Sequence, residues 1–366
     1  MNWRHRKGRN TGSKTRLQET CLKSICLECE ENNDGPQLCF TFGVIADIQY
    51  ADKGDALSFW KTGIRYYRNS YHLLQSAIEE WNSEANQPGF VLQLGDIIDG
   101  VNVKLKTSQS SLDKLLREIE KSKAPFHHVW GNHELYNFNR DYLIHSKLNT
   151  KVLEDTSALC SSTSPTCSPN NSDPMQFYAY HFSPFPKFRF IIVDTYDLSI
   201  LGLDRTSRKY QQSWDFLMQD DNPENANDLK DRCEEYCLEF NGGFSKEQLE
   251  WLNEVLTFAD QNKEKVVIAG HVPIHPGAKH GHCLAWNYTA ILSVLHAHAC
   301  VVCYIAGHDH SGGYCVDDKG IHHLTLEGVI ETPPGSHAFA TVYMYDNKMI
   351  IHGRGRTPSR ELEFRK

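Results

Sequence analysis

The sequence lacks any continuous apolar segment of the roughly 18 residues that a membrane-spanning helix needs. Its first residues, MNWRHRKGRNTGSKTRL, also lack the apolar centre and small-residue cleavage site of a secretory signal. We therefore expect a cytoplasmic protein with no membrane partner. Residues 1–36 are rich in basic and polar side chains, and we expect them to form a flexible N-terminal arm.

An excess of positive charge is also missing, because 46 Asp and Glu residues outnumber 38 Lys and Arg residues and give a formal net charge of −8 at pH 7. Nucleic-acid binding through the N-terminal arm would require a basic face that continues beyond it, and the acidic remainder shows none. Neither G-x-x-x-x-G-K-[ST] nor a strand-linked G-x-G-x-x-G occurs. These absences argue against a nucleic-acid partner and against P-loop or dinucleotide binding.

The 12 cysteines form no clear disulfide or zinc-binding pattern. A C-x4-C-x2-C triplet near the N-terminus has no clear fourth ligand, and Cys300 and Cys303 border one strand-like segment, which points them to opposite faces. Without a secretory route, reduced and mostly buried thiols are expected. Cys160 and Cys167, in a loop rich in Ser, Thr and Pro, are the pair most open to oxidation.

The segments that are present indicate an α/β protein. Of the 366 residues, 40% are hydrophobic and 23% are charged, as in globular domains. Strand-like apolar segments alternate with segments of helical period, such as 111–122, and this alternation predicts a sheet with crossover helices. The strand-like segments lie at 40–50, 90–96, 126–134, 265–271 and 301–310.

No long linker or internal repeat divides the chain. We expect a single domain over residues 37–356, with inserted loops at about 155–175 and 203–243, and a C-terminal tail at 357–366. Ser245 and Gln248 form a capping box, which predicts a helix starting at Lys246. The pattern GYCVDD-KG-IHHLTL predicts a β-hairpin.

Five segments share one form, in which an apolar strand is followed by a polar residue able to bind a metal, usually beside glycine. One such residue alone is more often a turn former or a histidine bonded to the backbone. However, a sheet gathers the carboxyl ends of its parallel strands at one edge, so five in series predict a shared site. The segments are Asp47-Ile48-Gln49, Gly95-Asp96, Gly131-Asn132-His133-Glu134, Gly270-His271-Val272-Pro273 and Gly307-His308-Asp309-His310.

The chemistry of these side chains suits Mn2+, Fe2+ or Zn2+, because carboxylate, amide and imidazole groups occur together and Mg2+ rarely recruits three histidines. No cysteine takes part, which disfavours a structural thiolate zinc site. Seven candidate ligands are too many for one ion and fit two ions that share a bridge. A pair of divalent ions is the device that clamps the attacking and leaving oxygens in phosphoryl transfer.

In their order, the motifs D-x-[H/Q], G-D, G-N-H-E, G-H-x-P and G-H-x-H over residues 47–310 resemble those of the calcineurin-like metallophosphoesterase superfamily. This resemblance implies a four-layer α/β/β/α sandwich with mixed sheets and two metals at one edge. It implies that His133 meets the substrate phosphate and can protonate the leaving group. Glu134 and Asp309 are candidates to orient imidazoles, with a solvated carboxylate as the open alternative for each. The implied ligands are Asp47, Gln49 and His310 for one metal, Asn132, His271 and His308 for the other, and Asp96 as the bridge.

Gln49 stands where most members of the superfamily have histidine. A neutral oxygen donor there favours Mn2+ over Zn2+, although a damaged first site is the alternative. The D-x-Q variant, together with GDIIDG, GNHELYNF and GHVPIHP, resembles the manganese-dependent ADP-ribose/CDP-alcohol diphosphatase family. That resemblance implies hydrolysis of ADP-ribose, CDP-choline, CDP-ethanolamine and CDP-glycerol to AMP or CMP. We expect the protein to act as a monomer on such small nucleoside diphosphate esters.

A substrate of this class needs a positive centre and a place for its base. Two divalent cations outweigh the charges of Asp47 and Asp96, so the centre attracts anions. A nucleobase needs an aromatic or apolar slot. Phe59 and Trp60, just after the first motif, and Cys283 and Trp286, after the fourth, are candidates to line that slot, although ordinary packing is the commoner role for an aromatic side chain.

Three alternatives stay open. The chain could be another two-metal hydrolase of this fold, such as a phosphoprotein phosphatase or a cyclic-nucleotide phosphodiesterase. It could be a non-enzymatic scaffold, although such a protein should have lost ligands and every expected position here holds a competent donor. Nucleic-acid binding through the N-terminal arm is the third alternative, and it is disfavoured by the acidic remainder of the chain.

Overall fold

The computed structural model describes residues 37–58, 61, 63–83, 85, 87–153, 177–218 and 237–365. Leu38–Lys366 forms one compact unit, separate from Met1–Gln37, and only that unit is considered below. The predictions for the N-terminal arm at 1–36 and for the pair Cys160 and Cys167 lie outside the described residues.

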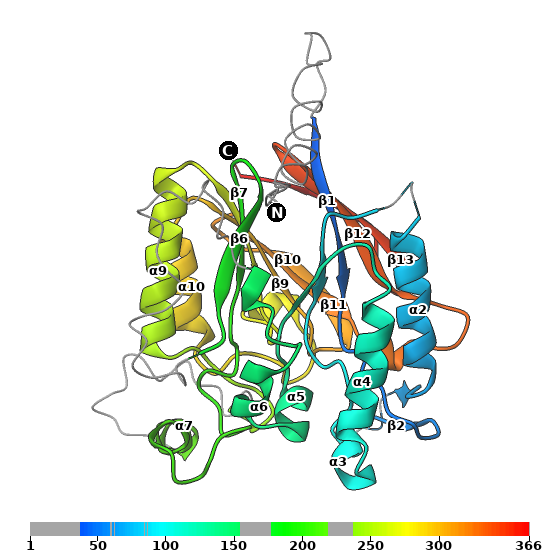
Figure 1. The fold of residues 1–366 in the computed structure, drawn as a ribbon. Helices are drawn as coiled ribbons and strands as arrows, with labels where there is room; N and C mark the ends of the chain where they lie inside the picture. The colour runs from blue at the N-terminus through cyan, green and yellow to red at the C-terminus, as the bar shows by residue number, and fades with distance from the viewer. Residues whose placement is uncertain are drawn as a thin grey trace, which may run out of the picture. The chain divides into compact units, whose positions relative to one another are not determined.

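Two mixed six-stranded sheets form the centre of the unit (Figure 1). In the first sheet the order is β14-β13-β12-β1-β4-β5, with β1, β4 and β5 parallel to one another and β1 antiparallel to β12. In the second the order is β10-β11-β9-β8-β7-β6, with β7, β8, β9 and β11 parallel. The strands of the first sheet are β1 (Leu38–Ile45), β4 (Val91–Gln93), β5 (Phe126–His128), β12 (Ala338–Tyr345), β13 (Lys348–Gly355) and β14 (Arg360–Glu363). Those of the second are β6 (Tyr180–Phe185), β7 (Phe188–Ile192), β8 (Lys265–Ala269), β9 (Val301–Ala306), β10 (Ser311–Val316) and β11 (His322–Glu327).

Helices cover the outer face of each sheet (Figure 1). Helices α2 and α4 pack together beside the first sheet, and α9 and α10 pack together beside the second. This arrangement confirms the predicted four-layer α/β/β/α sandwich. No helix among the described residues has the length and apolar character needed to cross a membrane. The helices are α2 (Asn69–Trp81), α3 (Val101–Leu105), α4 (Ser108–Ile119), α5 (Asn132–Asn137), α6 (Arg140–His145), α7 (Arg208–Met218), α9 (Lys246–Gln261) and α10 (Tyr288–His296), and a short hairpin pairs β2 (Ala56–Leu57) with β3 (Ile64–Arg65).

Aromatic side chains fill the space between the two sheets. The ring of Phe42 in β1 stacks on Phe90 with centroids 5.2 Å apart, and it meets Phe190 of β7 edge-on at 5.1 Å. Phe90 also meets Phe182 of β6 at 5.2 Å. Burying large rings from both sheets in one cluster fixes the separation of the layers and therefore the position of the strand ends that carry the site.

The last strand extends the first sheet further than the sequence indicated. β14 pairs with β13 in register, with Met349 opposite Leu362, and the Leu362 side chain is fully buried. The segment 357–366 therefore contains a strand of the sheet rather than only a C-terminal tail, and alternation over four residues is too short a pattern to reveal it.

Two local predictions can be checked directly. The predicted hairpin is formed by β10 and β11. Ser245 caps α9, since its Oγ accepts the Gln248 backbone N–H at 3.1 Å. The Gln248 side chain instead bonds the Asp194 backbone, so only half of the capping box forms. The described cysteines are free thiols, but only Cys300 and Cys303 are buried, so the expectation of mostly buried thiols is not met. The other four, Cys39, Cys237, Cys283 and Cys315, are partly buried.

Candidate metal centre

All seven predicted ligands follow the carboxyl ends of five strands, β1, β4, β5, β8 and β9. The first sheet contributes Asp47, Gln49, Asp96 and Asn132, and the second contributes the three histidines. Six of the side chains are buried, and the His310 side chain is only 10% exposed. The fold thus brings together residues that are up to 263 positions apart, at the sheet edge that the strand–loop pattern predicted.

The backbone at these strand ends is unusual. Asp47, Gln49, Asp96 and His308 have positive φ angles of 52°, 44°, 57° and 69°. Side chains other than glycine rarely adopt this left-handed region, and such strain clusters at functional sites. The turns make each chain segment leave its strand abruptly, so that the side chain of the turning residue faces the centre.

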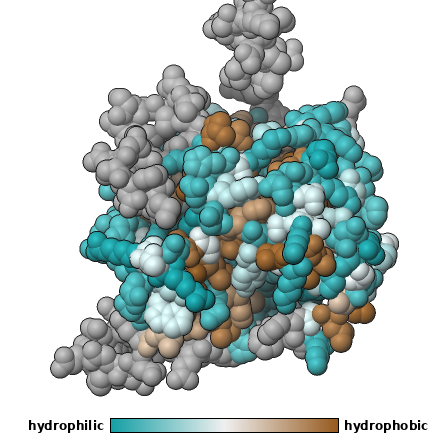
Figure 2. Space-filling view, turned by 60° about the horizontal axis from the view of Figure 1, so that its bottom comes forward, coloured by the Kyte–Doolittle hydropathy of each residue, from teal (hydrophilic) through white to brown (hydrophobic). Residues whose placement is uncertain are grey.

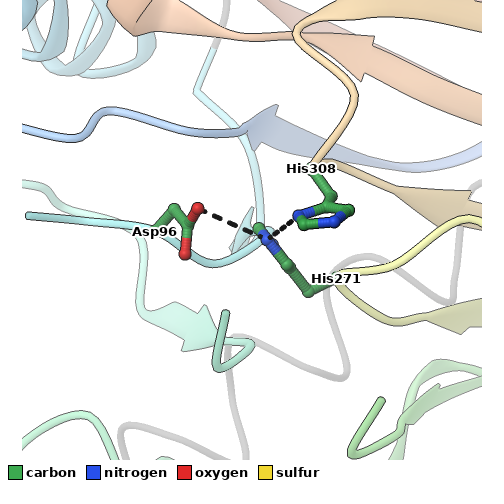
Figure 3. Close-up of side chains that lie close together, drawn as sticks. All are labelled: Asp96, His271 and His308. Carbon is green, nitrogen blue, oxygen red and sulfur yellow. Dashed lines mark hydrogen bonds and ion pairs between the residues drawn. The ribbon is translucent and has the colours of Figure 1, made fainter. Parts of the chain in front are cut away.

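Asp96, His271 and His308 form one half of the centre (Figure 3). His271 Nε2 lies 3.1 Å from His308 Nδ1 and 3.5 Å from Asp96 Oδ2. It also lies 3.2 Å from Asn132 Oδ1. Three loops and one helix N-terminus therefore bring together two nitrogens, a carboxylate oxygen and an amide oxygen. This combination of atoms is the donor set of a transition-metal site.

Asp47, Gln49 and His310 form the other half. His310 Nε2 lies 3.6 Å from Asp47 Oδ1, and Gln49 Nε2 lies 2.9 Å from both His310 Nε2 and Asp96 Oδ2. In this orientation Gln49 Oε1 is buried without a hydrogen-bond partner. Rotating the amide by 180° would place Oε1 beside His310 Nε2 and Asp96 Oδ2. A cation bound there could be coordinated by all three atoms, so the unpartnered oxygen fits a metal ligand.

Asp96 lies between the two halves. Its Oδ2 faces both Gln49 and His271, while its Oδ1 accepts the His133 backbone N–H at 2.8 Å. The glycine at 131 makes this position possible, because a Cβ there would stand 2.1 Å from Asp96 Oδ1. A carboxylate placed between two donor sets is what a bridging ligand requires.

The electrostatics of the centre favour positive charge. Burial opposes protonation of His271, but the Asp96 and Asp47 carboxylates outweigh it and raise the pKa of His271 to about 9. At His310 burial is likewise outweighed by Asp47 and Glu331, and the pKa rises to about 9. Carboxylates that hold protons on buried imidazoles would hold divalent cations in the same place, so the donor set fits the two metals that the fold implies.

His133 lies beside the centre, with Nε2 3.8 Å from Asp96 Oδ2. Its Nδ1 accepts the Gly100 backbone N–H at 2.7 Å, which leaves the ring proton on Nε2. Burial lowers the pKa of His133, although Asp96 and Asp99 act against this shift. The neutral imidazole therefore presents an N–H donor toward the centre.

Glu134 and Asp309 do not orient imidazoles, and that prediction is wrong. The Glu134 carboxylate accepts the backbone N–H groups of Asp96, Ile97 and Gly131, each at 2.7 Å. It thereby ties the loop after β4 to the loop after β5. Asp309 accepts the backbone N–H groups of His280 and Ser311. Both carboxylates bond main-chain donors of the loops, and these hydrogen bonds fix the loop backbones.

The imidazoles find other partners, which sequence reasoning missed. His271 Nδ1 lies 2.6 Å from Leu94 O, and His310 Nδ1 lies 3.0 Å from Glu331 Oε1. His308 Nε2 lies 2.8 Å from Asn241 Oδ1. A backbone carbonyl carries no sequence signal, while Glu331 and Asn241 stand outside the five motifs and could be found only from the fold.

The four candidates for the substrate slot separate in the structure. Phe59 and Trp60 lie outside the described residues. Cys283 borders the centre, with Sγ 4.0 Å from His308 O, and burial raises the pKa of its thiol. Trp286 is only 3% exposed, donates Nε1–H to Leu238 O and stacks on Phe216 at 5.7 Å, so its side chain is occupied by packing.

The end of the unit that carries β2, β3, α3 and α5 exposes apolar side chains. In Figure 2, which turns this end forward, brown apolar residues interrupt the hydrophilic surface. Exposed apolar residues on these elements offer contact surface to an uncharged part of a ligand. They are Leu57, Ile64, Val103, Leu105 and Tyr136.

The family model of the calcineurin-like phosphoesterases matches residues 40–312, which include all five strand-end segments. The chain belongs to this family. The phosphoesterase is 52% identical over 333 residues to the mouse (Mus musculus) manganese-dependent ADP-ribose/CDP-alcohol diphosphatase, across 91% of this chain and 96% of the relative. It is 51% identical to the human (Homo sapiens) protein of the same name, across 92% and 96%.

A solved structure agrees with the sequence relatives. The crystal structure of a dimetal phosphatase from Danio rerio matches this phosphoesterase with a TM-score of 0.79 and 45% identity, covering 90% of this chain and 100% of that one. The fold and the diphosphatase family predicted from the motifs are thereby confirmed.

Proposed function

We propose that this phosphoesterase is a two-metal, manganese-dependent hydrolase of nucleoside diphosphate esters. Water cleaves one P–O bond of the anhydride, so that ADP-ribose yields AMP and ribose phosphate, and CDP-alcohols yield CMP and a phosphorylated alcohol. The substrates are ADP-ribose, CDP-choline, CDP-ethanolamine and CDP-glycerol. The names of relatives that are about half identical over nearly the whole chain support this substrate class.

The observation that carries the proposal is the convergence of six other donor side chains, with oxygen and nitrogen atoms, around Asp96. One ion would be held by Asp47, Gln49 and His310, the other by Asn132, His271 and His308, and Asp96 would bridge them. When bound, the two ions supply Lewis acidity and a template for the reacting phosphate. Gln49, as an oxygen donor, supports Mn2+ over Zn2+ or Fe2+ as the activating metal.

Two described residues beside the ligands, His133 and Cys283, would contact the substrate. His133 would donate its Nε2–H to an oxygen of the scissile phosphate, because Gly100 holds its other ring nitrogen as an acceptor. Cys283, at the rim beside His308, stays a neutral thiol and offers an apolar contact rather than a nucleophile. Phe59 remains a candidate for contact with the base.

The proposal includes a cytoplasmic monomer with no membrane or nucleic-acid partner. The absence of a bilayer-spanning helix among the described residues is compatible with this assignment. The formal charge of −8 disfavours a polyanionic partner, whereas a local dimetal centre would still attract a small anion.

The experiment is to strip the protein of metal with chelator, reload it with Mn2+, Zn2+ or Mg2+, and assay ADP-ribose, CDP-choline and p-nitrophenyl phosphate separately. We expect Mn2+ to give the highest activity and the two diphosphates to be preferred, with AMP and CMP as chromatographic products. Exclusive hydrolysis of p-nitrophenyl phosphate would favour a phosphomonoesterase. Absence of any metal-dependent turnover would favour a scaffold.

A further inference from the structure

One segment outside the five motifs reaches the metal centre. The 237–243 strap, residues Cys237–Gly243, is the last part of the inserted loop that the sequence predicts at about 203–243. Its Asn241 is fully buried, and Asn241 Oδ1 lies 2.8 Å from His308 Nε2. The ring of Phe240 lies 5.7 Å from the ring of His308. The strap therefore contacts His308, one of the ligands in the half of the centre that contains Asp96 and His271, through both a polar and an aromatic side chain.

The orientation of the Asn241 amide is determined by a second contact. Its Nδ2 donates to His282 O at 2.8 Å, which leaves Oδ1 directed at His308. An amide oxygen can only accept a hydrogen bond. His308 Nε2 must therefore carry the proton, and the lone pair must lie on Nδ1, the nitrogen that faces His271 Nε2 at 3.1 Å.

The strap is anchored at both ends of this contact. Gly243 and Leu198 exchange two backbone hydrogen bonds at 2.8 and 2.9 Å. Trp286 donates its backbone N–H to Gly242 O at 2.8 Å and its Nε1–H to Leu238 O at 3.1 Å. Asn241 is thus held in place by groups that do not belong to the metal centre, as a preorganised partner of a ligand should be.

We infer that Asn241 is a positioning residue that fixes His308 as an Nδ1 ligand and thereby sets the affinity of the metal held by Asn132, His271 and His308. The inference rests on the two-metal site of the proposed function but not on its substrate. Outer partners of ligating histidines typically change metal affinity 10- to 100-fold. Only one ion should be affected, because the outer nitrogen of His310, Nδ1, donates its hydrogen bond to Glu331 and not to Asn241.

The test measures Mn2+ binding to the full chain by calorimetry with chelator competition, without substrate. In Asn241→Leu we expect one of the two ions to bind 10- to 100-fold more weakly while the other stays within about threefold. Asn241→Asp keeps an acceptor oxygen toward His308 and should restore binding to within about tenfold of the unaltered protein. Asn287→Leu is the matched control, because Asn287 bonds the backbone of Phe244 next to the strap without touching His308.

Several results would overturn the inference. These are two ions bound with unaltered affinity in Asn241→Leu, an equal loss of both ions, or the same single-site loss in Asn287→Leu. A second measurement needs no variant of Asn241: 15N spectra of histidine-labelled, metal-free protein, assigned with His308→Gln, should show His308 protonated on Nε2. Protonation on Nδ1 would contradict it. Failure to hydrolyse diphosphates would reject the proposed function and leave both measurements unaffected.

Discussion

At the scale of single residues, the ligands are held by backbone conformations that their side chains disfavour. Of the eight described non-glycine residues with positive φ, four are ligand candidates: Asp47, Gln49, Asp96 and His308. Strained turns of this kind cost of order 1–3 kcal/mol each and persist only where surrounding structure enforces them. This strain energy is compatible with a metal centre, where the free energy of cation binding offsets the cost of the strained backbone.

Gln49 stands where the resemblance to the superfamily leads us to expect histidine. We predict that Gln49→His retains activity but shifts the preference from Mn2+ toward Zn2+, because an imidazole replaces a neutral oxygen donor. The measurement is turnover after reloading with each metal, compared with Gln75→His on the outer helix α2. An unchanged order of activation would show that Gln49 is not a ligand.

His133 provides a second prediction. His133→Ala should keep both metals while kcat falls at least about 100-fold, because one hydrogen-bond donor to the transition state is lost. Because Gly100 and burial keep the ring neutral, it acts as a hydrogen-bond donor, and the loss should be equal for a natural diphosphate and for an ester with a low-pKa leaving group. A smaller loss with the better leaving group would identify His133 as a general acid instead.

At the scale of elements, the site depends on how closely the loops after β4, β5 and β8 approach one another. Gly131 has an extended backbone, φ −106° and ψ −179°, which any residue can adopt. What excludes a larger residue is space: an added Cβ would lie 2.1 Å from Asp96 Oδ1 and 2.8 Å from His271 Cε1. The glycine at position 131 is therefore a packing requirement.

We predict that Gly131→Ala folds but loses metal, with both ions at least about tenfold weaker, because Asp96 faces both halves of the centre. Metal content after desalting, measured by mass spectrometry, checks this prediction. Gly54→Ala is the control, since nothing lies within 4 Å of a Cβ at that position. Full metal content in Gly131→Ala would mean that Asp96 can move without loss of the bridge.

Sequence patterns predicted the elements that bring the ligands together, and the reason is physical. Buried parallel strands are continuous apolar runs, and a polar residue that ends such a run must lie at the sheet edge. The same reasoning cannot find Asn241 or Leu94 O, because their role depends on which loop passes over the centre. It misjudged Glu134 and Asp309 for a related reason: unsatisfied backbone donors at tight turns compete for carboxylates and leave no trace in the sequence.

At the scale of the whole unit, buried histidines make stability depend on pH. His127, 3% exposed in β5, stacks on Phe182 across the gap between the sheets at 3.9 Å, and its Nδ1 lies 2.9 Å from Tyr180 Oη. Burial, assisted by neighbouring His128, lowers the pKa of His127 to about 3. The unfolded chain, with a histidine pKa near 6.5, therefore binds a proton at a pH where the folded chain does not.

The contribution of neutral His127 to the free energy of unfolding is fully present above pH 6.5. It declines as the pH falls toward 3. We predict that His127 alone lowers the free energy of unfolding by about 2 kcal/mol between pH 7 and pH 5. Denaturant titrations of metal-free protein at both values measure this change. In His127→Gln, which keeps a polar partner for Tyr180, the pH-dependent loss should be smaller by that amount. An equal loss in both proteins would show that other groups govern the acid response.

The division of ligands between the two sheets has a consequence for biosynthesis. Each proposed ion takes donors from both sheets, and the first sheet is itself completed late, because β1 near the start of the unit pairs with β12 near its end. When the nascent chain has emerged from the ribosome as far as Asn132, it contains four of the seven candidate ligands but none of the three ligand histidines. We therefore expect the metals to bind after the complete chain has been released from the ribosome. Free Mn2+ in the cell would then bind the folded protein and would not contribute to the early steps of folding.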